Sequence, residues 1–518
     1  MPEKTLKKLN ASVLPQWKVC FLAALAVGLL AHLYKIVNWL PNWDSLVFRY
    51  DPQNMLALGR WFLPVACAFS SFYDLPFFNG MLAIVFYALG AVCVCRLFNV
   101  QKKITAALIG AVAVSFPVVT SVLMYNYVAD GYGVAFFLSA LAAVLLTKDK
   151  LRYYALGAVL IALSAGIYQA YITVTITLLL CKLITDILHQ NVSFGAIGKK
   201  GLWMLLSGAA GVALYFAVLK ILLGVFSTEL IEYQGISGTA SLSGIDLAGF
   251  LYTMKETFIS CFFDFSNGVN VYVVLNALLL LLTLTYYIID IVKTKLYQKP
   301  LHLLAVVVLS ALLLPGACAL ALLNPAVDYH NLMRMGYLVF YLFFLLLYEK
   351  RERGRETDTC LKRWIVLIVS LVLVANQVVI ANVSYHKAQI AYEKSYGVLI
   401  RIADRIEQTP ETEQCKKLLV VGALDDSEAY SVELTPDLTG ITDGYILRAD
   451  DEIVGQSVLC AALNDYCGKE YTFISGTEKA ALLEKEEIKA MKQWPSQNCV
   501  VVIEDIVVIK LGVEGEKN

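Results

Sequence analysis

The chain has 518 residues, of which 58% are hydrophobic and only 16% are charged, and its mean hydropathy is +0.65. Ordinary soluble domains are about half apolar and about a quarter charged. This composition therefore excludes an ordinary soluble protein and predicts a polytopic membrane protein. The 42 basic and 42 acidic residues balance at pH 7, so nothing in the net charge suggests a nucleic-acid partner.

Eleven apolar segments approach or exceed the roughly 20 residues that a helix needs to cross the hydrocarbon core of a membrane. They are residues 18–39, 79–98, 104–124, 132–147, 153–167, 170–188, 202–226, 269–292, 301–323, 335–348 and 364–384. We divide the stretch 153–188 because it is too long for one crossing and has the polar residues Tyr168 and Gln169 in its middle. The predicted fold class is an α-helical polytopic membrane protein with about eleven transmembrane helices.

The basic residues predict the orientation of these helices, because the cytoplasmic loops of membrane proteins are rich in lysine and arginine. When the N-terminus, with Lys4, Lys7 and Lys8, is placed in the cytoplasm, every loop predicted inside is basic. The segments predicted outside carry fewer bases and more acids and aromatic residues. These are residues 40–78, 125–131, 227–270 and 324–334. An odd number of spans then places the C-terminal region outside the cytoplasm.

The C-terminal region differs from the rest of the sequence. We predict a membrane domain at residues 1–384, with its first outer loop at residues 39–78, and an extracytoplasmic α/β domain at residues 385–518. About 130 residues are enough for an independent core. The residue pattern predicts helices at 385–408, 452–465 and 477–492, and strands at 417–422, 500–503 and 507–511.

Four of the twelve cysteines lie in this region, at Cys415, Cys460, Cys467 and Cys499. In an oxidising compartment they can form disulfides, with three possible connectivities. Cys460 and Cys467 would be about 10 Å apart on a continuous helix, which is too far for a disulfide between them.

Two acids and two arginines gather in the first outer loop, at Asp44, Asp51, Arg49 and Arg60. Asp44 lies beside the first apolar segment, where a carboxylate can act as a general base on a sugar hydroxyl. Alternatively, Asp44 caps a short interfacial helix. The arginines present the fork of donors that suits a phosphate, or they contact lipid headgroups.

Further polar residues lie at the predicted outer ends of the spans. They are Lys35, Asp74, Asp130, Tyr168, Gln169, Lys220, Asp328, His330 and Arg334. Lys220 and Arg334 are candidates for a lipid phosphate, and His330 or Asp328 for a substrate contact. The alternatives are snorkelling of the lysines, ordinary loop polarity, and satisfaction of backbone groups at a helix break by Tyr168 and Gln169.

The long outer loop at residues 227–270 has two parts. Residues 234–244 are rich in Gly, Ser and Thr, and residues 250–265 are apolar and aromatic, which predicts an amphipathic helix on the membrane. The loop is either a substrate gate or an ordinary linker. The sequence has no phosphate-cradling glycine loop, dinucleotide fingerprint or zinc-protease motif, which disfavours nucleotide-driven chemistry.

Several stretches resemble a known family. They are WDSLVFRY at residues 43–50, LGRWF at 58–62, SSFYDLP at 70–76, SAGIYQAY at 164–171 and WPSQNCVVVIEDIVVIKL at 494–511. The chain resembles the bacterial O-antigen glucosyltransferases, membrane enzymes of the GT-C class that use polyprenyl-phosphate sugars. Ser45 follows Asp44 where a second aspartate is common in that family, so a mechanism with two adjacent carboxylates is not carried over.

The resemblance implies a GT-C-like, inverting hexosyltransferase that takes its sugar, expected to be glucose, from undecaprenyl phosphate. Asp44 would deprotonate an acceptor hydroxyl. Arg60, Arg334 and also Arg49 or Lys220 would stabilise the phosphate leaving group. The other candidates would contact substrate, namely Asp51, Tyr168, Gln169, His330 and Asp130. Because a cationic clamp can replace a metal, neither a metal nor a cofactor is expected.

The same resemblance implies the partners and the location. The acceptor would be a polysaccharide or teichoic-acid-like polymer at the outer face of the bacterial cytoplasmic membrane, bound with help from the C-terminal domain. Membrane lipid, a lipid-linked-sugar synthase and a flippase would complete the system. The competing hypothesis is a transporter or flippase for sugars or lipid-linked sugars, which internal repeats would favour. A non-enzymatic partner in polysaccharide assembly is a second alternative.

Overall fold

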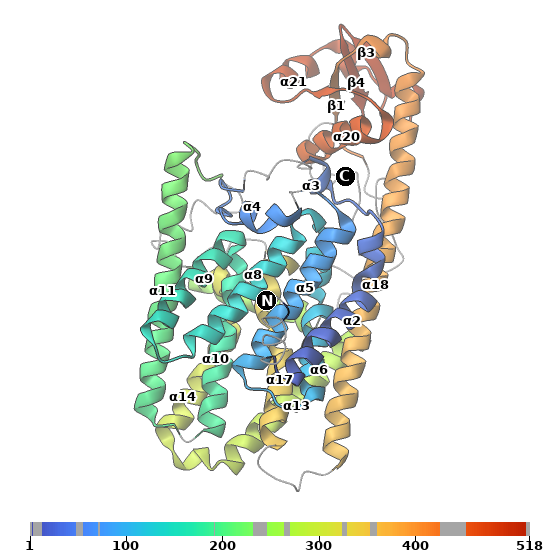
Figure 1. The fold of residues 1–518 in the computed structure, drawn as a ribbon. Helices are drawn as coiled ribbons and strands as arrows, with labels where there is room; N and C mark the ends of the chain where they lie inside the picture. The colour runs from blue at the N-terminus through green and yellow to red at the C-terminus, as the bar shows by residue number, and fades with distance from the viewer. Residues whose placement is uncertain are drawn as a thin grey trace. The chain divides into compact units, whose positions relative to one another are not determined.

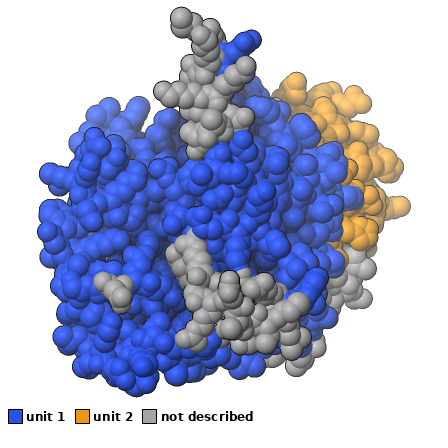
Figure 2. Space-filling model, turned by 60° about the horizontal axis from the view of Figure 1, so that its bottom comes forward, with its two compact units in different colours: residues 1–37, 51–382 blue, residues 38–50, 383–518 orange. Residues whose placement is uncertain are grey.

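The computed structural model describes residues 3, 13–47, 55–70, 73–190, 192–231, 246–263, 270–323, 329–352, 360–424 and 452–513. The chain packs as two compact units, which Figure 2 distinguishes by colour. Unit 1 comprises residues 1–37 and 51–382, and unit 2 comprises residues 38–50 and 383–518. Unit 2 is therefore built from two pieces that are far apart in the sequence.

Unit 1 is a helix bundle (Figure 1). Its longer helices are α2 (Pro15–Val37), α5 (Pro76–Leu97), α6 (Lys103–Ser115), α7 (Pro117–Met124), α8 (Asn126–Leu146), α9 (Leu151–Ile167), α10 (Ile172–His189), α11 (Phe194–Val225), α12 (Leu247–Phe262), α13 (Val271–Lys293), α14 (Pro300–Ala311) and α17 (Leu338–Glu352). Shorter pieces are α4 (Leu63–Ala66), η1 (Cys67–Ser70), η2 (Gln169–Tyr171), η5 (Leu296–Gln298), α15 (Leu313–Ala317), α16 (Ala319–Leu323) and η6 (Asn331–Tyr337). Helix α18 (Cys360–Glu407) begins in unit 1 and continues into unit 2.

The eleven predicted spans are all helical, but their count as full crossings is lower. In the described residues, nine helices are long and apolar enough to cross a membrane, and the bent pair α6–α7 makes a tenth. The one predicted span left over, at residues 153–167, is helix α9, which has 17 residues and is shorter than a full crossing. The bend of 40° between α6 and α7 lies at Pro117, which begins α7 and lacks the N–H that would continue the α6 ladder.

Small residues allow the helices of unit 1 to pack closely. A β-carbon on Gly110 of α6 would lie 2.3 Å from the carbonyl oxygen of Cys20 on α2. A β-carbon on Gly133 of α8 would lie 3.0 Å from the carbonyl oxygen of Ala83 on α5. Such close backbone approach is typical of helix pairs in membranes, where association depends on packing.

One buried acid joins two helices of the bundle. Glu349 of α17 is fully buried, and its carboxylate accepts hydrogen bonds from the backbone N–H of Gln101 (2.9 Å) and from the hydroxyl of Thr105 (2.9 Å). Gln101 lies just before α6, whose first N–H groups have no partner within the helix. The carboxylate therefore caps α6 and also complements the positive end of its dipole.

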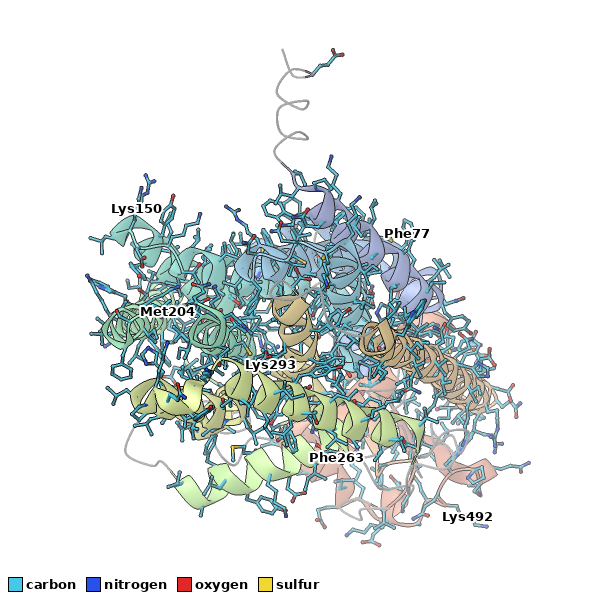
Figure 3. The ribbon with its side chains drawn as sticks, turned by 90° about the horizontal axis from the view of Figure 1, so that it is seen from below. Phe77, Lys150, Met204, Phe263, Lys293 and Lys492 are labelled. Carbon is cyan, nitrogen blue, oxygen red and sulfur yellow. The ribbon has the colours of Figure 1, made fainter. Side chains whose placement is uncertain are left out.

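The helix predicted at residues 250–265 is observed as α12 (Leu247–Phe262), which lies beside α13 (Figure 3), and its position on the membrane stays a prediction. Figure 3 labels Phe263, the residue that follows α12. The glycine-rich part of the same loop, predicted to be mobile, lies outside the described residues.

Unit 2 contains a four-stranded sheet in the order β2–β1–β4–β3 (Figure 1). Its elements are α3 (Trp43–Val47), η7 (Thr412–Gln414), β1 (Lys417–Val421), α20 (Glu452–Cys467), β2 (Thr472–Phe473), α21 (Gly476–Leu483), α22 (Glu486–Lys489), η8 (Gln497–Cys499), β3 (Val500–Ile503) and β4 (Ile506–Lys510). Strand β1 runs parallel to β2 and β4, and β3 pairs antiparallel with β4. Central strands of this kind are buried on both faces, which explains the apolar run at residues 418–421.

The predicted elements of this region are largely confirmed, with two differences. The predicted helix 385–408 is helical, but it is continuous with the last span and forms the end of α18. The predicted helix 477–492 is two short helices, α21 and α22. Cys415, Cys460, Cys467 and Cys499 are free thiols, so the disulfides considered above are not formed.

Candidate active site

Three interruptions of regular helix meet in unit 1. They are the segment at residues 55–62, the break between α9 and α10 at Tyr168–Tyr171, and the 3₁₀ helix η6. The backbone N–H of Phe62 donates to the carbonyl of Gly166 (2.7 Å), and η2 packs against η6. Irregular backbone within a membrane protein is tolerated where it is buried in protein or lines a polar cavity. This region is therefore the natural candidate for a site.

Arg60 is fixed in this region by two tyrosines. Its guanidinium lies over the ring of Tyr168, with the central carbon 4.9 Å from the ring centroid. Its Nη1 donates to the hydroxyl of Tyr132 at 3.5 Å, and the rings of Tyr132 and Tyr168 stack at 4.9 Å. The contact with the aromatic face restricts the position of the guanidinium, and its positive charge can still interact with a bound anion. Arg60 remains partly exposed.

The backbone before Arg60 has a conformation that requires glycine. Gly59 has φ +75°, and a β-carbon there would lie 2.6 Å from the hydroxyl oxygen of Tyr215 and 2.8 Å from Nε2 of Gln169. The Tyr215 hydroxyl donates to the Gly59 carbonyl (3.1 Å), and the Gln169 amide donates to the Leu58 carbonyl (3.0 Å). Gln169 thus satisfies a backbone carbonyl of the segment at residues 55–62, whereas the sequence interpretation placed such a role at the helix break itself.

We predict that Gly59→Ala lowers the free energy of unfolding by about 2–4 kcal/mol, because it combines a left-handed backbone with a steric clash. Thermal unfolding of the purified protein in detergent measures the effect. Gly208→Ala is the matched control, because no atom lies within 4 Å of its added β-carbon on α11. Equal melting temperatures for the two variants would contradict the prediction.

Arg334 and His330 lie on or beside η6. The Arg334 guanidinium donates through Nε to the Tyr329 carbonyl (3.0 Å) and through Nη1 to Oδ1 of Asn331 (2.8 Å). These bonds hold the side chain within its own segment. His330 is half-buried and precedes the first turn of η6.

Asp130 is a buried carboxylate in α8, two residues before Tyr132. Its exposed fraction is 1%, and neither carboxylate oxygen has a hydrogen-bond partner of ordinary geometry among the described residues. The side chains of Ser70 and Cys67 lie beside it. A buried acid without full compensation is costly in a membrane protein and is usually retained for function.

Asp44 belongs to unit 2. It lies in the first turn of α3, half-buried, and its backbone N–H donates to Oδ1 of Asn42 (2.9 Å). The side chain of Asn42 therefore satisfies a backbone N–H in the first turn of the short helix. The role of the Asp44 carboxylate stays a prediction.

The remaining candidates are Lys220, Arg49 and Asp51. Lys220 is exposed on α11, which lies at the edge of unit 1 beside α9 (Figure 1). Arg49 and Asp51 fall outside the described residues. Within the described ranges, no three His, Cys, Asp or Glu side chains lie close enough together to hold a metal ion. The predicted roles of all these residues stay predictions.

Sequence reasoning missed the aromatic and hydroxyl partners of Arg60. Tyr132 and Tyr215 were the residues missed, and both lie beside Arg60, whereas Trp61 is visible in the sequence as the aromatic neighbour of Arg60. The indole N–H of Trp61 is buried and has no hydrogen-bond partner among the described residues. In a sequence this rich in tyrosine, with 29 in total, an intramembrane tyrosine gives little signal. The polar break at Tyr168 and Gln169 was the useful clue.

Comparison with known proteins gives one family. The family model described as glucosyl transferase GtrII matches residues 33–347. The matched range includes the Arg60 segment, the Tyr168–Tyr171 break and η6, and it ends within α17. The stretch 494–511, one of those that carried the resemblance, lies beyond it. No curated protein and no solved structure matches the chain.

Proposed function

Because this chain belongs to the GtrII glucosyl transferase family, we propose that it transfers glucose from undecaprenyl phosphate to a cell-surface glycopolymer. The family match confirms the predicted resemblance, and the apolar helices fit a multi-pass membrane protein. The donor, the acceptor and membership of the GT-C class are parts of the proposal. The acceptor is a polysaccharide or a teichoic-acid-like polymer at the outer face of the cytoplasmic membrane.

In the proposed reaction, an acceptor hydroxyl oxygen attacks C1 of the glucosyl group, and the bond from C1 to the phosphate oxygen breaks with inversion. The proton of the hydroxyl passes to the carboxylate of Asp44 as general base. The products are the glucosylated acceptor and undecaprenyl phosphate. Negative charge develops on the leaving phosphate, so a cationic group at that position stabilises the transition state.

The observation that carries the proposal is the placement of Arg60. A guanidinium held by two tyrosines at a meeting of three helix interruptions can bind a phosphate while losing little conformational freedom. The buried indole N–H of Trp61 is a further donor beside Arg60. Arg60 is therefore the principal phosphate ligand in our proposal.

Other residues complete the proposed site. Arg334, Arg49 and Lys220 are proposed as additional phosphate ligands, of which Arg334 lies on the segment that packs against η2. The proposed sugar and acceptor contacts are Asp51, Tyr168, Gln169, His330 and Asp130. Tyr168 has its ring beneath Arg60, and Gln169 acts by holding the backbone of the segment. Because the cations can stabilise the phosphate, no metal is required.

We also propose that unit 2 lies outside the cytoplasm and contributes to acceptor binding. The charge asymmetry of the predicted loops supports this orientation. A donor presented at the outer face has to be made and flipped by other proteins, so the enzyme is proposed to act after a lipid-linked-sugar synthase and a flippase.

The test uses purified protein in detergent with radiolabelled undecaprenyl-phosphate-glucose and a crude cell-envelope acceptor. We expect label to leave the lipid fraction and enter the polymer, at the same rate with and without EDTA. Loss of transfer in EDTA, with recovery on adding Mg²⁺, would overturn metal independence alone. Reaction only with another polyprenyl-phosphate hexose would correct the sugar. If no donor reacts, the enzyme proposal fails, and transport by sealed vesicles becomes the hypothesis to test.

A further inference from the structure

The segment that carries Asp44 is part of unit 2, although about 330 residues separate it from the rest of that unit. Its described side chains are all buried or half-buried. Leu40 and Asn42 are each 1% exposed, Ser45 is 2% exposed and Leu46 is 4% exposed. A chain segment buried to this degree is docked on its surroundings rather than lying free.

An apolar contact docks one end of the segment. Leu46 belongs to the same core cluster as Leu459 and Leu463 of α20 and Ile402 of α18. Helix α3 packs directly against α20. The burial of Leu46 therefore ties the residue two positions after Asp44 to the core of unit 2.

A stack of aromatic rings docks the other end. Trp39 stacks on Tyr466 of α20, with ring centroids 5.9 Å apart and planes at 22°. Tyr466 meets Tyr396 of α18 edge to face, with centroids at 5.8 Å. Both geometries are favourable for aromatic pairs. The segment is thus anchored five residues before Asp44 as well as two residues after it.

Local hydrogen bonds fix the backbone between these two anchors. Oδ1 of Asn42 accepts from the N–H of Asp44 (2.9 Å), and the Asn42 carbonyl accepts from the hydroxyl of Ser45 (2.7 Å). The backbone at Asp44 is therefore fixed by a packing contact on each side and by hydrogen bonds within the segment. A general base has to be placed within a fraction of an ångström of the proton it removes.

We infer that unit 2 positions the catalytic carboxylate, with Trp39 and Tyr466 as positioning residues that act through Asp44. This inference rests on the proposed function and deepens it. The C-terminal unit was expected only to help bind the acceptor, whereas the docking gives it a direct part in the chemical step. A positioning residue affects kcat, and it leaves the KM for the donor nearly unchanged.

The test compares Tyr466→Leu with Tyr471→Leu. Tyr471 is the matched control, because it is an aromatic residue of the same core cluster, and its hydrogen bonds to Asn464 use the Tyr471 backbone atoms. We expect Tyr466→Leu to lower kcat about 10- to 100-fold with the donor KM unchanged, because small misplacements of a reacting group have effects of this size. Tyr471→Leu is expected to keep kcat near the wild-type value. Tyr466→Phe keeps the ring and is expected to restore most of the activity.

A second measurement does not depend on activity. Hydrogen exchange of residues 39–47 is expected to rise in Tyr466→Leu and to stay low in Tyr471→Leu. In an Asp44→Asn background, Tyr466→Leu is expected to cause no further loss, since it acts through the same carboxylate.

The failures can be told apart. If the wild-type protein transfers no sugar, the proposed function fails. If it transfers sugar, and Tyr466→Leu retains full kcat or keeps residues 39–47 protected, the inference is overturned while the function stands. Wild-type transfer by Asp44→Asn would overturn the base assignment and the inference together.

Discussion

Asp44→Asn is expected to reduce glucosyl transfer about 10²–10⁴-fold, the usual contribution of a general base. The substitution keeps the size of the side chain and the backbone bond to Asn42, so the fold and the binding of the donor should persist. The loss should therefore appear in kcat, measured as the steady-state release of label from undecaprenyl-phosphate-glucose.

The matched control for this variant is Asp404→Asn. Asp404 is an exposed acid on α18 whose carboxylate bonds to Gln408, and its neutralisation should leave transfer unchanged. Equal activity in the two variants would show that Asp44 is not the base. Attention would then move to Asp130, the buried carboxylate two residues from Tyr132.

Arg60→Met is expected to lower kcat/KM for the donor about 10²–10³-fold, as found when a group that stabilises a developing negative charge is removed. Arg60→Lys keeps the charge but loses the planar fork and its stacking on Tyr168, so an intermediate loss of about 10-fold or more is expected. Initial rates across a range of donor concentrations give both constants.

Arg96→Met provides the comparison for Arg60. Arg96 is exposed in the last turn of α5, and its guanidinium lies 5.8 Å from the ring centroid of Trp17. Its replacement also removes a cation from an aromatic face, so it controls for that loss. If Arg60→Met retained the wild-type donor KM and kcat, the assignment of Arg60 to the phosphate would have to be abandoned.

The spans could be predicted from the sequence because crossing a membrane imposes a simple rule on local composition. Each predicted apolar segment is helical, and the break at Tyr168 and Gln169 was visible as polar residues within an apolar run. The short span at residues 153–167 was also visible in the sequence and is α9. The continuity of α18 across residue 385 was not predicted, because apolar composition does not fix where a helix ends beyond the membrane.

The candidate site was only partly predictable for a related reason. Arg60 and Gly59 are informative in the sequence, because a base and a flexible backbone are unusual beside a span, and Gly59 does adopt a positive φ. The stacking of Tyr132 and Tyr168 beneath Arg60 is a contact between distant segments, and no local pattern encodes it. The docking of Leu46 in unit 2 is non-local in the same way.

Because unit 2 is built from two distant pieces of the chain, it can be completed only late in protein synthesis. Strand β4 lies between β1 and β3, so the sheet is incomplete until residue 510 has been made. Roughly 460 residues follow the Asp44 segment before that point, which takes on the order of 20–90 s at typical rates of synthesis. The segment is among the first parts of the chain to be made, and α20, against which α3 packs, follows it by about 400 residues. The helices of unit 1 are therefore all made before the proposed base can dock on α20, and the sheet of unit 2 is completed last.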